Sequence, residues 1–198
     1  MVELGTFFWI LVSLFALIGA LRGWTREVIA TAGLILSLFA LNQFGPLIVG
    51  VARAGLETGM PADFPQEGIR RQQFYILSAI HLLIAFFSYQ GPALAGSRMG
   101  DRLRIRDNFQ DKLLGGIIGT INGYLVVGTI WSFLEYQIID RGYQQLPPGV
   151  AYPFQTIIRP AVDSDLVTLM ARLPLPFLAD YLPFLLVGIF LFVLIVMI

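Results

Sequence analysis

Five long apolar runs limit what this chain can fold into, because a helix that crosses a membrane needs roughly 20 predominantly apolar residues. Hydrophobic residues make up 57% of the sequence and charged residues only 13%. The mean hydropathy of +0.75 is that of a membrane protein. The strict alternation of a membrane barrel is not visible. We therefore predict an all-α polytopic membrane bundle of five transmembrane helices and a short external amphipathic helix. The predicted spans cover residues 1–23, 28–51, 74–95, 113–134 and 182–198.

The second run contains a break, "NQFGP", at residues 42–46. Its uninterrupted part, 28–41, would extend only about 21 Å, which is too short for a hydrocarbon core of roughly 30 Å. The helix must therefore continue through the break. We expect a kink at Pro46, with the side chain of Asn42 or Gln43 satisfying the freed backbone groups.

Basic residues predict the orientation of the spans, since arginine and lysine near span ends are retained on the cytoplasmic side. Arg22 and Arg26 follow the first run, and five more basic residues lie in the loop 96–112, on the same side of a five-span chain. We expect a protein of the bacterial inner membrane with its N-terminus outside and its C-terminus in the cytoplasm. The predicted parts are a four-span core at 1–139, a proline-rich external segment at 140–181 and a fifth span at 182–198.

One piece of the external segment has helical periodicity, "RPAVDSDLVTLMARLP" at residues 159–174. Pro160 suits a first helical turn and Pro174 would end the run. We expect a short helix along the outer interface or against the bundle. Asp163 and Asp165 favour local capping over a metal site, because no third ligand is near.

Glycines four residues apart form a stripe in the fourth run, at Gly115, Gly119 and Gly123. Gly19 and Gly23 form a shorter stripe in the first run. Small residues let two membrane helices approach until their backbones touch. We expect these two spans to pack through their glycines, although a homodimer through the longer stripe fits the sequence equally well.

Two stretches carry a resemblance to a known family. "LFALIGALRGWTREVIATAGLILSLFAL", with Arg26 and Glu27 opening the second span, and "FQDKLLGGIIGTINGYLVVG" resemble the colicin V production protein family, CvpA. The resemblance covers roughly residues 4–134. It implies a small polytopic protein of the bacterial inner membrane, linked to toxin export or envelope homeostasis and without established enzymatic activity.

Polar residues inside the predicted spans are the candidates for function. His81, the only histidine, is either a neutral imidazole bonded to another helix or a proton relay or axial ligand to a pigment magnesium or haem iron. The sequence itself requires no cofactor. We expect Asn122 to link helices, and we expect Glu135 and Asp140 to be solvated at the outer end of the fourth span.

The charged turn after the first span has two interpretations. Arg22 and Arg26 can simply fix topology near the headgroups. Alternatively, Arg22, Arg26 and Glu27 contact an anionic lipid or a cytoplasmic partner. Glu27 also suits the positive end of the helix that it opens.

Catalytic motifs are otherwise missing from the sequence. Without cysteine and with a single histidine, there is no serine, cysteine or zinc site, no phosphate-binding loop and no dinucleotide fingerprint. A net charge of zero indicates no nucleic-acid partner. We expect a non-catalytic protein whose partners are lipids, further copies of itself or other membrane subunits. The alternative is an accessory or assembly subunit of a large respiratory or photosynthetic complex.

Overall fold

The computed structural model describes residues 2–57, 66–94, 108–139, 142–161 and 164–197. Four long helices form its body, and each contains a stretch that is long and apolar enough to cross a membrane. A shorter apolar helix follows near the C-terminus. The predicted all-α membrane bundle is therefore confirmed. The helices are α1 (Leu4–Arg22), α2 (Trp24–Glu57), α3 (Gln66–Leu94), α5 (Asn108–Glu135) and the shorter α8 (Leu182–Met197).

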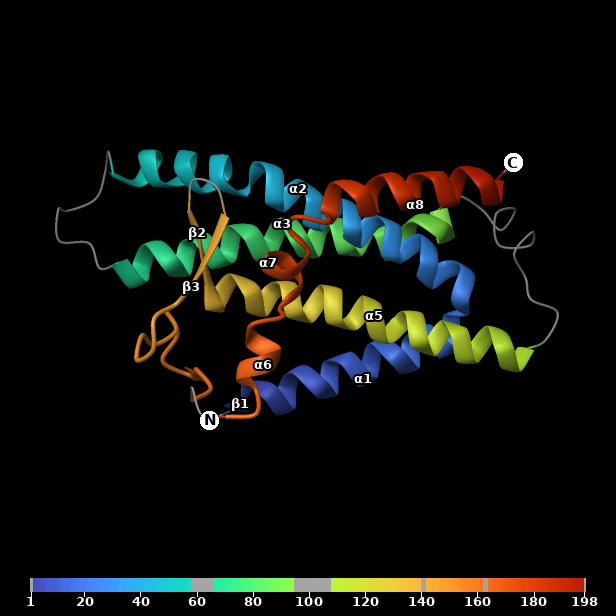
Figure 1. Cartoon of the computed structure of the whole chain (residues 1–198), viewed down its shortest axis with the longest axis horizontal. Helices are drawn as coiled ribbons and strands as arrows, with labels where there is room; N and C mark the ends of the chain where they lie inside the picture. Colours follow the sequence, from blue (N-terminus) through green and yellow to red (C-terminus); the bar gives the residue numbers. More distant parts are fainter. Residues whose placement is uncertain (1, 58–65, 95–107, 140–141, 162–163, 198) are drawn as a thin grey trace.

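The long helices run up and down side by side, and the chain ends lie at opposite ends of the bundle (Figure 1). We call the end with the N-terminus and the strands the hairpin end, and the end with the bend between α1 and α2 the turn end. The 16 residues of α8 extend about 24 Å. The fifth predicted span is thus present as a helix, shorter than the other four.

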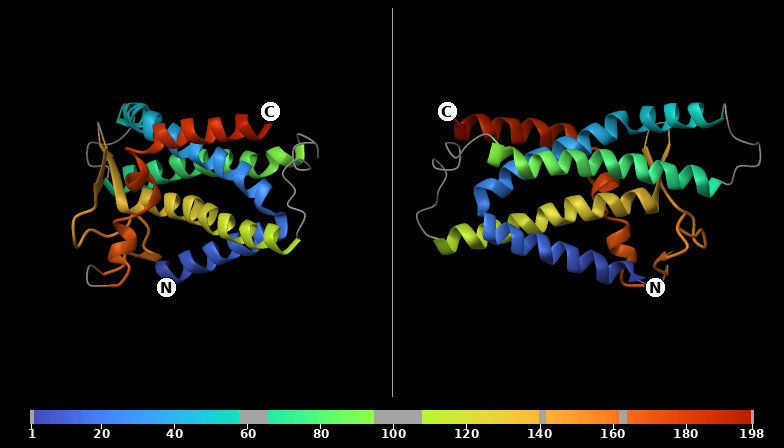
Figure 2. Two further views of the ribbon diagram at one scale, coloured as in Figure 1. Left: turned by 45° about the vertical axis from the view of Figure 1, so that its right-hand side comes forward. Right: turned by 180° about the vertical axis from the view of Figure 1, so that it is seen from behind.

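Helix α5 lies at the centre and contacts α1, α2 and α3, while α8 packs against α2 (Figure 2). Two apolar clusters fill the interior. One is formed mainly by α2, α3 and α5 around Leu38, Leu77 and Leu125. The other joins α1 and α5 to the segment after the hairpin, around Phe8, Trp131 and Leu173.

Helix α1 is followed by its capping residue Gly23, whose φ of 84° lies in the left-handed region that favours glycine. The Gly23 N–H donates to the Gly19 carbonyl at 2.9 Å. The next residue, Trp24, opens α2 and donates its backbone N–H to Asp111 Oδ1 in α5 at 3.1 Å. Because the first N–H groups of a helix lack partners within it, this carboxylate from another helix serves as the cap.

The second span continues through the predicted break, because α2 includes Pro46. Its later part runs in a different direction from its first part (Figure 1). The predicted role of Asn42 is wrong. Its Oδ1 accepts from Tyr143 OH at 3.0 Å and its Nδ2 donates to the Ala179 carbonyl at 3.5 Å, so it holds the later segments against α2. Gln43 is exposed.

Short strands were not predicted, yet two pairs occur at the hairpin end. Strand β2 (Tyr136–Ile139) continues directly from α5 and pairs antiparallel with β3 (Gly142–Gln145), with Tyr136 opposite Gln145. Strand β1 (Val2–Glu3) pairs in parallel with β4 (Ile157–Ile158). These pairings fold the segment after α5 back over the end of the bundle.

The helix predicted across residues 159–174 is much shorter than expected. It is reduced to α6 (Val167–Met170), and Pro160 lies outside it. Pro174 begins a further helix, α7 (Pro174–Leu178), at a first-turn position where its missing N–H costs nothing. Met170 and Leu173 are buried in the cluster with α1 and α5, so the segment packs against the bundle.

Candidate functional site

The first candidate site surrounds Glu27, whose side chain is fully buried in the first turn of α2. Its Oε1 lies 3.0 Å from Arg22 Nε at the end of α1. Its Oε2 accepts hydrogen bonds from Asn122 Nδ2 in α5 at 2.9 Å and from Tyr89 OH in α3 at 3.2 Å. A buried carboxylate needs such partners, because an unpaired charge in a low dielectric is very costly.

Further contacts connect the residues around Glu27 to one another. Arg22 donates to the Tyr89 carbonyl at 3.1 Å and lies 4.5 Å above the Tyr89 ring. Asn122 also donates to the Glu27 carbonyl at 3.0 Å, and its Oδ1 accepts from Thr31 Oγ1 at 2.7 Å. We call Arg22, Glu27, Thr31, Tyr89 and Asn122 the Glu27 cluster. It joins α1, α2, α3 and α5.

Three members of the Glu27 cluster were candidates from the sequence, but their arrangement was not foreseen. Arg22 turns inward to Glu27 instead of outward to headgroups. Glu27, with no exposed surface, cannot contact a partner at the bundle surface. Asn122 links helices as expected. Arg26 is exposed and stands apart from the cluster. Tyr89 was missed because tyrosine is common at membrane interfaces and carries no signal of its own.

The two glycine stripes face each other within one chain. A Cβ added at Gly119 would lie 2.5 Å from the Phe15 carbonyl oxygen and 3.0 Å from Gly19 Cα. One added at Gly123 would lie 3.1 Å from Val12 Cα. Gly115 likewise lies against Gly19 and Gly23, so the stripe of α5 is covered by α1. That face is therefore not free for a second copy.

A second candidate site surrounds Glu135 at the hairpin end, where the expectation of a solvated side chain is wrong. Glu135 is fully buried. Arg159 NH2 lies 2.6 Å from Oε1, and Arg159 Nε donates to Oε2 at 3.0 Å. Tyr152 OH donates to Oε2 at 2.7 Å and Gln145 Nε2 to Oε1 at 3.0 Å. We call these four residues the Glu135 cluster. Asp140 lies outside the described residues.

The Glu135 cluster anchors the segment after the hairpin. Arg159 also donates to the carbonyls of Leu146, Pro147 and Val150. Its hydrogen bonds to Glu135 raise the pKa of the Arg159 guanidinium. Burial, and next the Glu135 charge, raise the pKa of the Tyr152 phenol. At neutral pH the phenol therefore stays a donor. No local sequence pattern connects Glu135 with an arginine 24 positions later.

The third candidate residue, His81, is completely buried in α3. Its Nδ1 lies 2.9 Å from Ser37 Oγ in α2. Its ring meets the Phe133 ring edge-on, with centroids 6.4 Å apart. A pigment or haem could reach the imidazole only if the surrounding helices separated, and its role as such a ligand stays a prediction.

The acidic pair of the external segment is described only in part. Asp165 is exposed, and Asp163 lies outside the described residues. Among the described residues, no group of three histidine, cysteine, aspartate or glutamate side chains could hold a metal ion.

The comparisons with known proteins agree with the resemblance seen in the sequence. The family model described as Colicin V production protein matches residues 5–154. This range includes α1, α2, α3, α5 and the β2–β3 hairpin, and ends before Arg159 and α8. Neither the curated proteins nor the solved structures gave a match. Since the family model covers well over half of the sequence, this chain belongs to the colicin V production protein family of membrane proteins.

Proposed function

We propose that this protein acts without catalysis in toxin export or envelope maintenance, through association of its helices with other components of the membrane. The Glu27 and Glu135 clusters carry the proposal. Each buried carboxylate is held by an arginine and a tyrosine from other segments. A general acid or base must be free to exchange a proton with a substrate. Carboxylates held in this way link parts of the fold: Glu27 joins helices, and Glu135 joins the end of α5 to the segment after the hairpin.

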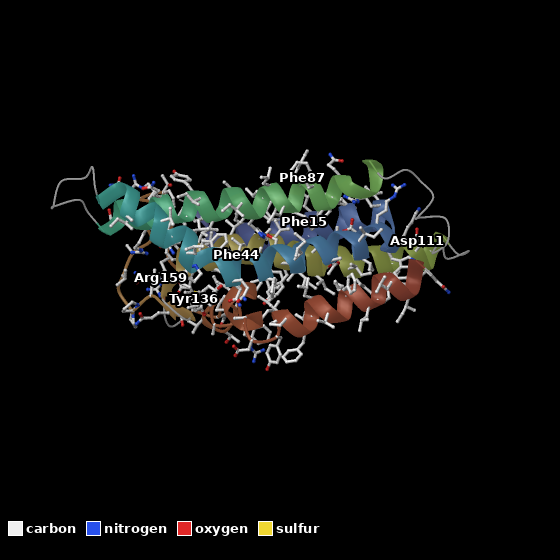
Figure 3. The ribbon with its side chains drawn as sticks, turned by 90° about the horizontal axis from the view of Figure 1, so that it is seen from above. Phe15, Phe44, Phe87, Asp111, Tyr136 and Arg159 are labelled. Carbon is white, nitrogen blue, oxygen red and sulfur yellow. The ribbon has the colours of Figure 1, made fainter. Side chains whose placement is uncertain are left out.

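The outer surface supports association. The glycine stripes are used inside the chain, whereas large aromatic side chains remain on the outside of α3 and α8. Phe86 and Phe87 are more than half exposed, as are Phe184 and Phe190, and Phe87 points away from the bundle (Figure 3). In a membrane this surface meets lipid tails or the helices of other proteins.

The role is tested in bacteria that lack the gene, by measuring secretion of a colicin V type toxin and resistance of the envelope to detergent. We expect the deletion to reduce at least one of these and the wild-type protein to restore it. Glu135→Gln keeps the side-chain shape but removes the charge. We expect this variant to restore the phenotype in proportion to the amount of folded protein, because the charge stabilises the fold and performs no chemistry.

Glu67→Gln is the matched control, since Glu67 is an exposed residue at the start of α3. A deletion that leaves both secretion and resistance unchanged would refute the proposed role. A Glu135→Gln protein that reaches the membrane in normal, folded amounts and yet restores nothing would refute the non-catalytic part.

One observation favours the accessory-subunit alternative. The family match ends at residue 154, and the chain continues with the Arg159 anchor, α6, α7 and α8. Helix α8 packs against α2 and leaves much of its side-chain surface open. Such an addition is the expected place for contacts within a larger complex. The orientation with the N-terminus outside stays a prediction.

A further inference from the structure

Three buried polar atoms in the interior of the bundle have no hydrogen-bond partner among the residues that the structure describes. They are His81 Nε2, Ser78 Oγ and Thr129 Oγ1. His81 and Thr129 have no exposed surface, and Ser78 is 7% exposed. Buried polar groups almost always have a partner, which is protein or ordered water. Three unpaired atoms in one part of the interior therefore require an explanation.

The contacts of His81 place the three side chains on facing surfaces. The backbone carbonyls of Leu125 and Val126 in α5 approach the imidazole, but neither reaches hydrogen-bond geometry with Nε2, and the ring meets the Phe133 ring in the same helix. Thr129 comes three residues after Val126 and four before Phe133. Residues at these spacings share one face of a helix, so Thr129 lies on the face of α5 that His81 contacts.

Ser78 lies on the same surface of α3 as His81, for a similar reason. It precedes His81 by three residues in α3, and so lies one turn away on the same face. Helices α3 and α5 run in opposite directions and contact each other. Ser78 lies one turn before His81 in α3, and Thr129 lies one turn after Val126 in α5. Because the two helices are antiparallel, these two residues are at the same level of the bundle.

We propose that Ser78, His81 and Thr129 form a hydrated site between α3 and α5, in which water hydrogen-bonds to His81 Nε2. A buried water typically makes about three hydrogen bonds, and two hydroxyls and a ring nitrogen supply that number. Hydroxyl groups donate or accept, so they match water whichever tautomer the imidazole adopts. Ser37 holds Nδ1 at 2.9 Å and so leaves Nε2 as the atom for the water.

A buried leucine separates this site from the Glu27 cluster along α2. Leu34 is completely buried and comes between Thr31 of that cluster and Ser37, which contacts His81. The hydrated site is thus a distinct feature of the interior. It stands independently of the proposed role in export or envelope maintenance.

The test uses the fact that His81 is the only histidine. Protein labelled with ¹⁵N in the histidine ring is reconstituted in lipid bilayers, and solid-state NMR measures magnetisation transfer from water to the ring nitrogens at short mixing times. We expect clear transfer in the wild type. Thr129→Val keeps the shape of the side chain but removes the hydroxyl, and Ser78→Ala removes the other one. Each is expected to lose most of the transfer signal.

Ser132→Ala is the matched control. Ser132 is equally buried one turn along α5, but its Oγ donates to the Gly128 carbonyl within its own helix at 2.9 Å. We expect its transfer signal to match that of the wild type. The absence of transfer in the wild type would contradict the hydrated site. Equal transfer in the wild type and all three variants would contradict it as well. A dry site would also make Thr129→Val raise the melting temperature, since it would remove an unpaired hydroxyl.

Discussion

Gly119→Leu is expected to lower the melting temperature of the detergent-solubilised protein by about 6–12 °C. A side chain at this position would meet the Phe15 carbonyl oxygen and Gly19 Cα, both of which are backbone atoms of α1. Backbone cannot rotate away as a side chain does, so α1 and α5 must separate along much of their contact. Overpacking typically costs about 1–3 kcal/mol, and we expect the upper value of about 3. Each 1 kcal/mol lowers Tm by roughly 2–4 °C in a chain of this length.

The measurement compares thermal unfolding of Gly119→Leu with that of Gly188→Leu. Gly188 lies in α8, and apart from the nearby backbone of its own helix a Cβ added there would have no atom of the described residues within 4 Å. We expect the Gly188→Leu protein to melt close to the wild type. If both variants melt like the wild type, α1 and α5 do not pack through these glycines.

Glu27→Leu is expected to be the other strongly destabilising change. It removes the ion-pair partner of Arg22 and the acceptor of Tyr89 OH, and it leaves Asn122 Nδ2 with only the backbone carbonyl of residue 27. Breaking a buried ion pair on one side costs about 3–5 kcal/mol. Arg22 keeps 22% of its side-chain surface exposed and can reach water in part, so we expect a loss near the lower value, about 3 kcal/mol.

Arg26→Ala is the control, because Arg26 belongs to the same charged turn but is exposed. We expect its Tm to stay within a few degrees of that of the wild type. The double variant Arg22→Leu with Glu27→Leu leaves no unpaired charge and is expected to recover part of the loss. Losses that simply add in the double variant would show that Arg22 and Glu27 do not interact.

Much of the fold was predictable from the sequence because membrane helices must be long and apolar. The four long spans follow from this rule. The glycine stripes allowed two alternatives, contact between α1 and α5 or a homodimer, and the structure has the contact within one chain. The residues of the charged turn were also found from the sequence. Their arrangement was not, since a positive charge near a span end fits a headgroup contact and an inward ion pair equally well.

The hairpin end was predicted poorly, for physical reasons. Glu135 was expected in solvent because it ends a span, but Arg159 and Tyr152 are brought over it by the fold of a segment that begins after the span. The strands have only two to four residues each, too few for a periodic signal. A helix was expected at Pro160 from local spacing, whereas tertiary packing of Met170 and Leu173 decides the path there.

The most direct test of the proposed function is the composition of the particle that contains this protein in its native membrane. The protein is tagged, extracted in a mild detergent and purified, and the mass, absorbance spectrum and protein content of the particle are measured. We expect a colourless particle in which this chain accompanies membrane proteins of export or envelope maintenance. A large particle that absorbs visible light and contains respiratory or photosynthetic subunits would contradict the proposal and identify the protein as an accessory subunit of that complex.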